Sequence, residues 1–330
     1  MSAAYEAAHG SKAFVVRSDR VRIEFTGPKA AEALNGLLTN DIAKLAPGMG
    51  CYAAALTPKG KVIADVRVFA RDDGRFVLDT SAAAGPGLLA MLRKYVNPRL
   101  ATWRDITAEF GDVTVLGPFA ASDFASLAAY GSVAANDGGF IARVPDFGLP
   151  ATAMIVRPEF LEGTIRSLRA EMPELDSATA EVLRVEAGRP LWGADMDENT
   201  LAQEAALDRA DLGAISFDKG CYTGQETVAR VHFRGHVNRT LRGLRFHAPP
   251  TPAGDTAGAN TPVPRSALRH PSQNPAGELR SIAHSPRLGL IALAYVRKEV
   301  ADGEVVEVDD GHGGALGATV TALPFSTTAT

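Results

Sequence analysis

The sequence predicts an α+β protein with a multi-domain body and an all-β module at its C-terminal end. Its 330 residues exceed the ~100–200 residues of a typical domain. Helical and strand patterns alternate between residues 21 and 187, but turn signals typical of hairpins outnumber the long spacings that parallel crossovers need. Two short strand patterns, at 288–295 and 305–308, indicate a terminal β-barrel that starts near residue 240.

The composition excludes several classes of protein. Apolar residues make up 46% and charged residues 22%, which is typical of globular chains. With 34 basic and 38 acidic side chains, the net charge of −4 gives no bulk attraction to nucleic acid, so we expect no nucleic-acid partner. The longest apolar run, at 288–296, is far shorter than the ~20 residues of a membrane span. Two cysteines and no recognisable targeting segment favour a cytoplasmic protein.

The expected elements follow from periodicity. Alternation of period two predicts strands, and apolar residues at i, i+3, i+4 and i+7 predict helices. A Thr-Pro-Lys-Gly turn at 57–60 should join two of the strands into a hairpin. The expected strands are 21–25, 51–56, 61–69, 75–80, 113–116 and 153–156, and the expected helices are 28–38, 88–96, 122–130, 158–172 and 177–187.

A proline-rich stretch lies within the terminal module that starts near residue 240. Residues 248–277 contain seven prolines, a composition that predicts an exposed loop without regular structure.

Several catalytic motifs are missing. The chain has no phosphate-binding P-loop, no Gly-x-Gly-x-x-Gly after a strand, no Gly-x-Ser-x-Gly and no His-Glu-x-x-His, which argues against nucleotide hydrolysis and zinc-peptidase chemistry. Cys221, His232 and His236 do not have a recognised zinc spacing.

The most unusual segment surrounds Cys221. Gly220 and Gly224 bracket the thiol, and Lys219 precedes it. Backbone amides of a glycine-rich turn and a nearby ammonium would stabilise a thiolate, the form that attacks electrophiles or binds soft metals. The alternative is a small buried apolar side chain. Arg230, Arg234 and Arg239 follow, and this basic segment is either a site for a ligand carboxylate or a solvated face.

Glu186 is the second candidate. In a helix that starts at Ser177, it shares a face with Ala178 and Val182, and it lies in the last turn, where the helix dipole disfavours a negative charge. A carboxylate that shares a face with apolar residues and lies at the helix end that disfavours negative charge is a site candidate. Pairing with Arg184 or Arg189 is the structural alternative.

Asp65 and Asn40 are weaker candidates. Asp65 shares a strand face with Arg67, with which it is expected to pair if its role is structural. Asn40 follows a helix, where turn chemistry is the usual role.

Taken together, these segments resemble the YgfZ-like folate-binding proteins, relatives of the glycine-cleavage T-protein (aminomethyltransferase). The octet KGCYTGQE at 219–226 is similar to the signature of that branch. Supporting motifs are LNGLLTND at 34–41, TPKGK at 57–61, RVEAGRP at 184–190 and SIAHSP at 281–286.

The resemblance implies a ring of three domains, with two interleaved α+β subdomains in residues 1–239, a β-barrel in 240–330 and tetrahydrofolate or a one-carbon derivative in the central opening. Glu186 would match the pterin-binding carboxylate of the family. Other residues in or next to the motifs are expected to contribute to folate binding, namely Arg184, Asn40, Lys219, Gln225 and Arg230.

Two functions follow from the resemblance. The first is a tetrahydrofolate-binding accessory factor in assembly or repair of iron-sulfur proteins, with iron-sulfur client or carrier proteins as the partners. In it, Cys221 supplies a thiolate to a cluster, a metal bound transiently, or a reactive carbon. The second is a folate-dependent one-carbon transferase, in which Asp65 orients the folate and Cys221 only packs. Ala64 stands where aminomethyltransferases have the first of two aspartates, which argues against methylene transfer. A folate-sensing scaffold is a third reading.

Overall fold

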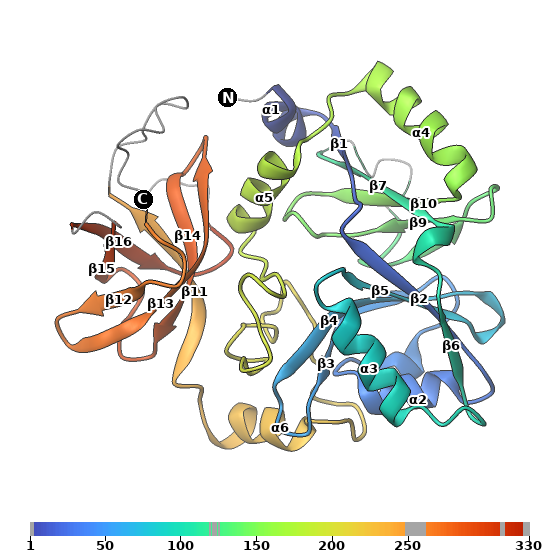
Figure 1. Cartoon of the computed structure of the whole chain (residues 1–330), viewed down its shortest axis with the longest axis horizontal. Coiled ribbons are helices and arrows are strands. Elements are labelled where there is room, and N and C mark those ends of the chain that lie inside the picture. The colour runs from blue at the N-terminus through green and yellow to red at the C-terminus, as the bar shows by residue number, and fades with distance from the viewer. Residues whose placement is uncertain are drawn as a thin grey trace.

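The computed structural model describes residues 3–118, 120, 124, 126–247, 262–310 and 314–325. Two five-stranded antiparallel sheets form the body of the molecule, and a closed six-stranded barrel stands beside them (Figure 1). Helix α5 (Ser177–Glu186) and an irregular segment, 187–224, lie between the body and the barrel. This arrangement confirms the α+β class and the C-terminal barrel.

The first sheet has the strand order β3-β4-β5-β2-β6. Helices α2 (Ala30–Leu37) and α3 (Gly85–Tyr95) share a buried apolar cluster with one face of it, which includes Leu34, Leu88 and Val66. The expected hairpin around 57–60 is confirmed, because β3 and β4 pair antiparallel across that turn. The first helix begins at Ala30 rather than at Pro28. The strands are β2 (Arg20–Thr26), β3 (Gly50–Leu56), β4 (Val62–Ala70), β5 (Phe76–Ser81) and β6 (Thr102–Asp105).

The second sheet has the order β1-β7-β10-β9-β8, and helix α4 (Pro158–Glu171) packs on it through Ile165. Because β1 belongs to this sheet and β2 to the first, the chain alternates between the two sheets. Of the expected helix 122–130, residues 126–130 form turns and bends, and 122, 123 and 125 lie outside the described residues. The strands are β1 (Ala13–Val16), β7 (Gly111–Leu116), β8 (Ser132–Ala134), β9 (Phe140–Arg143) and β10 (Ala151–Val156).

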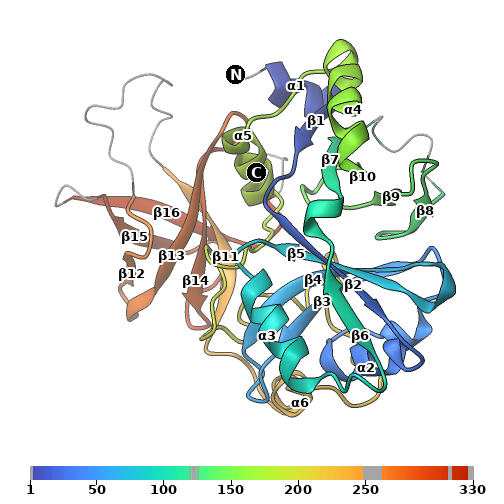
Figure 2. The same ribbon diagram turned by 45° about the vertical axis from the view of Figure 1, so that its right-hand side comes forward.

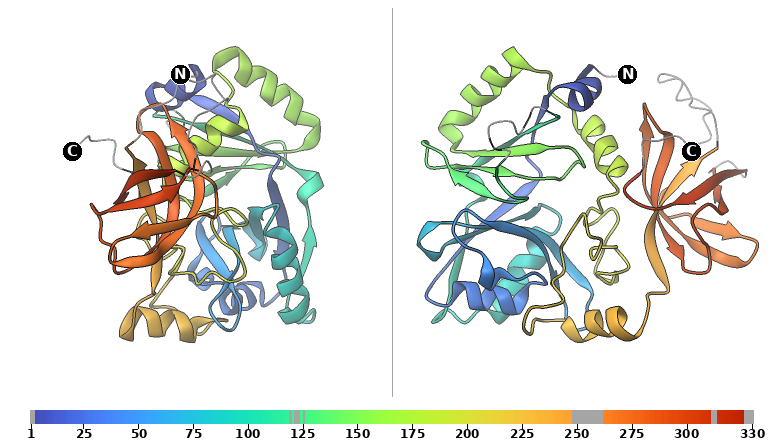
Figure 3. Two further views of the ribbon diagram at one scale, coloured as in Figure 1. Left: turned by 60° about the vertical axis from the view of Figure 1, so that its left-hand side comes forward. Right: turned by 180° about the vertical axis from the view of Figure 1, so that it is seen from behind.

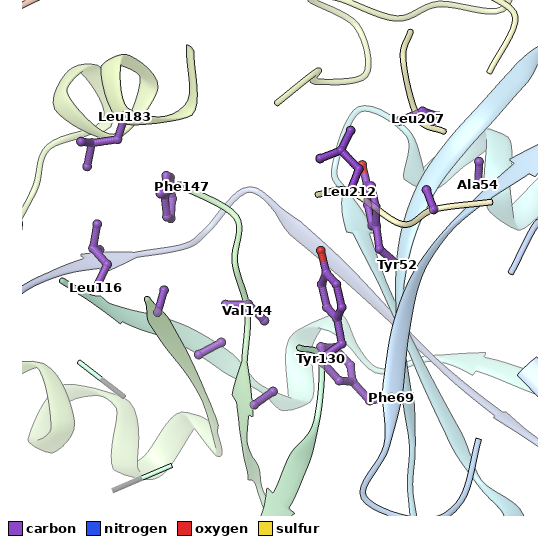
Figure 4. Close-up of a cluster of buried hydrophobic side chains, with 14 of the residues drawn as sticks. Tyr52, Ala54, Phe69, Leu116, Tyr130, Val144, Phe147, Leu183, Leu207 and Leu212 are labelled. Atoms are coloured by element: carbon purple, nitrogen blue, oxygen red, sulfur yellow. The ribbon is translucent and has the colours of Figure 1, made fainter. Parts of the chain in front are cut away.

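An apolar cluster joins the two sheets to α5 and to the irregular segment 187–224. Figure 4 shows Phe147 close to Leu183 of α5, with the Tyr52 and Tyr130 rings farther along the same cluster. The two tyrosine rings stack, with centroids 6.0 Å apart. Helix α1 (Ala3–Gly10) joins the same cluster through Tyr5.

The barrel runs in the order β11-β14-β13-β12-β15-β16 (Figure 3). Part of the expected loop 248–277 is regular, which corrects that expectation: β12 and the start of β13 lie within it, whereas 248–261 lie outside the described residues. Pro275 is tolerated because it lies where the register of these strands shifts, between the pairs Leu268↔Gly277 and His270↔Gln273. The strands are β11 (Arg239–Phe246), β12 (Ala267–His270), β13 (Gln273–Ser285), β14 (Gly289–Arg297), β15 (Val305–Asp309) and β16 (Ala315–Thr321).

Two helices flank the irregular segment 187–224. Helix α5 ends close to the barrel strands β13 and β14, and α6 (Gln225–Arg234) lies at the other end of the molecule, where the chain leaves the body for the barrel (Figures 1 and 2). Among the described residues, no helix combines the length and apolar character that a membrane span needs.

Candidate functional site

A cavity of about 610 Å³ lies where α1, the end of α5, the loop from β9 to β10 and the C-terminal segment meet. This volume falls within the ~300–1,000 Å³ range of small-molecule sites. The cavity is lined by charged and aromatic side chains, which include His9, Arg143, Phe147, Glu186, Arg189, Arg287 and Phe325.

Glu186, the last residue of α5, contributes a carboxylate to the cavity wall. Its side chain is 12% exposed, the Tyr5 hydroxyl donates a 2.6 Å hydrogen bond to its Oε1, and His9 Nε2 lies 3.5 Å from its Oε2. Burial acts to raise the pKa of Glu186, but the neighbouring polar side chains of His9, Ser285 and Tyr5 outweigh it and lower the pKa below its usual value. The carboxylate is therefore ionised at neutral pH.

The structural alternative for Glu186, pairing with Arg184 or Arg189, does not occur among the described residues. Arg184 contacts Asp195 at 2.7 Å and Glu181 at 2.8 Å, and Arg189 donates to a tyrosine hydroxyl at 3.4 Å. A carboxylate has about four lone-pair sites, so Glu186 can accept further hydrogen bonds from a ligand.

Three guanidinium groups give the rest of the cavity wall a positive character. Arg143, Arg189 and Arg287 line it, whereas its acidic side chains are Glu186 and Asp211. Arg143 donates to a backbone carbonyl at 2.7 Å, and Arg287 lies 3.8 Å from a glutamate of α1. This wall suits a ligand that carries carboxylates and also presents hydrogen-bond donors to Glu186.

A smaller cavity of about 60 Å³ is also lined by Phe147 and Arg189 and contains Asp65. The Tyr52 hydroxyl donates to Asp65 Oδ2 at 3.0 Å, and Oδ1 has no hydrogen-bond partner in the part of the chain that the structure describes. Burial raises the pKa of Asp65 above its usual value, against the opposing effects of Arg20 and Tyr52. Asp65 therefore has an acceptor atom available next to the larger cavity.

The expected ion pair between Asp65 and Arg67 is wrong, because Arg67 binds another aspartate. Asp79 lies directly across the sheet from both Arg22 and Arg67, and its Oδ1 is 2.6 Å from Arg67 Nη2. Arg20 donates to the same oxygen at 2.7 Å. Burial opposes ionisation of Asp79, but the three guanidiniums outweigh it and hold the pKa of Asp79 far below its usual range. This network fixes the strands that carry Asp65.

Two of the expected folate-binding residues have structural contacts. The Asn40 amide donates to the backbone carbonyls of Tyr52 and Gly213, both at 2.8 Å. Besides its acidic partners, Arg184 donates to Ser281 Oγ at 2.7 Å and so joins α5 to the barrel. Arg184 reaches the smaller cavity, but neither residue lines the larger one.

The loop before α6 displays Cys221 to solvent. The Lys219 ammonium turns inward instead and donates to the backbone carbonyls of Asn35, Leu38 and Asn40 at 2.6–2.7 Å. Burial lowers the pKa of Lys219 to about 8. The Cys221 thiol is therefore not a buried apolar side chain. It is accessible because it is exposed, and the Lys219 ammonium points away from it into the protein.

The structure separates Cys221 from Glu186. Gln225 begins α6 and Arg230 is exposed on it, and this helix lies at the opposite end of the molecule from α1 (Figures 1 and 3). None of the side chains that line the larger cavity comes from residues 219–230. The candidate residues therefore form two regions, a ligand cavity and an exposed thiol loop.

Sequence reasoning missed His9, Arg143 and Arg287, which line the cavity, and Tyr5, which donates a hydrogen bond to Glu186. Tyr5 and His9 are four residues apart on one short helix, so their shared face was the available signal. For Arg143 and Arg287 the sequence holds no comparable signal, because strand pairing and barrel position bring them to the cavity.

Comparison with known proteins identifies the family to which this chain belongs. Residues 9–156 match the GCVT N-terminal domain, and residues 239–326 match the glycine cleavage T-protein C-terminal barrel domain. The chain belongs to the glycine-cleavage T-protein family. Within it, the chain is a relative of both the aminomethyltransferases and the YgfZ proteins, as the sequence motifs predicted.

Three relatives and one solved structure illustrate this position. An aminomethyltransferase of Rubrobacter xylanophilus is 28% identical over 92% of this chain and 80% of its own length. The tRNA-modifying protein YgfZ of Cronobacter sakazakii is 32% identical over 69% of each chain. The mitochondrial iron-sulfur cluster assembly factor IBA57 homolog of Phaeosphaeria nodorum is 27% identical over 80% of this chain and 61% of its own. The glycine cleavage system aminomethyltransferase T of Bartonella henselae shares the fold, with a TM-score of 0.83, 20% identity and coverage of 98% and 88% of the two chains.

Proposed function

We propose that this protein binds a reduced folate and acts as an accessory factor in assembly or repair of iron-sulfur proteins. One observation carries the folate assignment: a largely buried, ionised Glu186 carboxylate faces a cavity of about 610 Å³ whose other charged groups are mainly arginines. The amino-pyrimidine edge of a pterin presents adjacent N–H donors that match a carboxylate. The glutamyl carboxylates of the same molecule would have Arg143 and Arg287 as counter-charges.

The iron-sulfur part of the proposal is supported by the exposed thiol and by the relatives. Cys221 is exposed, and a thiolate is a preferred ligand of iron-sulfur clusters. No group of three side chains that could hold a metal occurs among the described residues, so the remaining ligands would come from a partner. A relative of this chain is named an iron-sulfur cluster assembly factor.

A second candidate function, one-carbon transfer, is favoured by Asp65. Its Oδ1 has no hydrogen-bond partner among the described residues, and Asp65 lines the cavity next to the proposed folate site. Residue 64 packs in the core with α2 and α3 while Asp65 lines the cavity, as strand alternation requires, so Ala64 removes no carboxylate from the cavity. An assay of one-carbon transfer from an aminomethyl donor to tetrahydrofolate separates the functions: the accessory role predicts no turnover.

The accessory role is tested in a strain that lacks this protein. Activity of an aconitase-type enzyme should fall in that strain, return with the natural chain and remain low with Glu186→Ala or Cys221→Ser. Full recovery with both variants would refute the accessory role.

A further inference from the structure

The exposed face of α6 carries an aromatic and basic surface that the cavity does not use. We call Arg230, His232, Phe233 and Arg234 the α6 patch. Val228 is the buried side chain of this helix, and Phe233 is 68% exposed, more than any other large apolar side chain that the structure describes. An exposed aromatic next to arginines is typical of protein interfaces, where these residue types provide much of the binding energy.

Aromatic contacts join this patch to the loop that carries Cys221. The Phe217 ring stacks on His232, with centroids 3.6 Å apart, and Phe233 meets His232 edge-on at 4.7 Å. At the other end of the loop, Gly224 caps α6 with φ +86°. Both ends of the loop that carries Cys221 are therefore held against α6, the helix that carries the patch.

The two arginines of the patch lack acidic partners among the described residues, whereas His232 interacts electrostatically with Asp208. Arg230 and Arg234 are exposed and make no ion pair with any described residue, whereas other exposed arginines, such as Arg104 and Arg169, pair with glutamates. Lys59 and Lys298 add exposed or partly exposed positive charge nearby, since Gly60 packs against α6 and Lys298 contacts His236 just after it. Unpaired cations in a chain of net charge −4 favour an acidic partner surface.

We infer that the α6 patch docks an acidic protein that carries or receives an iron-sulfur cluster, with the docked surface adjacent to Cys221. This inference rests on the proposed function, from which the kind of partner is taken. A protein is favoured over RNA because the patch combines a protruding Phe233 with few cations, whereas RNA binding draws on many phosphate contacts. Cys221 would then supply one thiolate and the partner the other ligands.

The test measures binding of a plant-type [2Fe–2S] ferredoxin, a small acidic protein, to the full chain by biolayer interferometry. The double variant R230E/R234E and the single variants R230E and F233A should each weaken binding by ~10-fold or more. The control R166E/R269E changes the net charge equally at two other exposed arginines without a described ion pair, and it should change binding less than ~2-fold. Affinity for the natural chain should fall steeply with salt.

Three controls make the outcome decisive. Circular dichroism of R230E/R234E checks that α6 persists when Arg234 is changed. The single variants R230E and F233A, which keep Arg234, measure the contribution of the patch to ferredoxin binding independently. Calorimetry with tetrahydrofolate should give the same affinity for all variants and the natural chain. If the natural chain does not bind folate, the proposed function is refuted, whereas the ferredoxin-binding measurement is unaffected. Three results would overturn the inference. They are absence of ferredoxin binding, an equal loss of ferredoxin affinity in both double variants, and tighter binding of a single-stranded RNA 20-mer than of ferredoxin.

Discussion

The Tyr5 hydroxyl donates a 2.6 Å hydrogen bond to Glu186, a residue 181 positions later in the chain. Burial, followed by the neighbouring Glu186, raises the pKa of Tyr5 above its usual value, so the hydroxyl stays protonated and remains a donor. The N-terminal helix therefore orients the carboxylate to which we assign the pterin. His9, one turn further along α1, lies beside the other oxygen of the same carboxylate.

Tyr5→Phe should lower the free energy of unfolding by ~1.5–3 kcal/mol at pH 7, the usual value of a hydrogen bond to a charged group. The pKa of Glu186 is lowered in the folded state, so its stabilisation is present above its unfolded pKa of ~4.3 and is lost as pH falls through the folded value. Urea unfolding at pH 7 and pH 3 measures this. A difference between the variant and natural chain that is as large at pH 3 as at pH 7 would contradict the assignment.

Asp79→Asn should cost ~3–5 kcal/mol, because it leaves the buried arginines around it without their counter-charge. In the natural chain the pKa of Asp79 is held far below its usual range, so its contribution is full above ~pH 4 and declines as pH falls below that value. Thermal unfolding across pH 2–7 tests both statements. Asp302→Asn, which removes an exposed partner of Arg242, is the control and should cost less than ~1 kcal/mol.

Asp65→Asn should leave folate affinity within ~3-fold and raise the melting temperature at neutral pH. A buried carboxylate whose pKa is raised above its unfolded value destabilises the fold once pH exceeds the unfolded pKa, so removing its charge should stabilise the protein at pH 7 but not at pH 3. The asparagine keeps an acceptor for Tyr52. A loss of iron-sulfur client activity as severe as that of Glu186→Ala would instead support one-carbon transfer.

Cys221 should react with iodoacetamide at least ~100-fold faster than Cys51 near neutral pH. Cys221 is exposed, whereas burial raises the pKa of Cys51 to about 12, against the opposing effect of Lys219, so Cys51 is almost entirely an unreactive thiol. Mass spectrometry of timed samples should show one rapid alkylation that Cys221→Ser abolishes and Cys51→Ser retains. Comparable rates at the two cysteines would remove the basis for a reactive thiol loop.

Local patterns predicted much of the fold. The alternation in 21–25 and 61–69 and the turn at 57–60 specify β2, β4 and the hairpin, because a strand with one buried face requires period two. Helix α5 was predicted from its periodicity and from Gly188 just after its end. Its last-turn carboxylate, Glu186, was found because it conflicts with the helix dipole.

The remaining features depend on contacts between distant segments. Asp79 pairs with Arg22 and Arg67 only because three strands align in register, which no local pattern specifies. Lys219 lies two residues before Cys221, and the sequence predicted that its ammonium would stabilise the thiolate. In the structure the ammonium instead donates to three backbone carbonyls near α2. The prolines of 248–277 argued against strands there, so β12 and the start of β13 were not predicted. Pro275 is accommodated by a register shift between these two strands, which depends on their pairing.

Calorimetric titration with tetrahydrofolate under anaerobic conditions tests the folate assignment most directly. The natural chain should bind with a micromolar Kd, roughly −8 kcal/mol, and Glu186→Ala should weaken binding by ~30-fold or more, since a charge-assisted hydrogen-bond pair is lost. Glu162→Ala, at an exposed glutamate of α4 without a described partner, is the matched control and should leave the affinity unchanged. Equal affinity of Glu186→Ala and the natural chain for tetrahydrofolate would contradict the assignment.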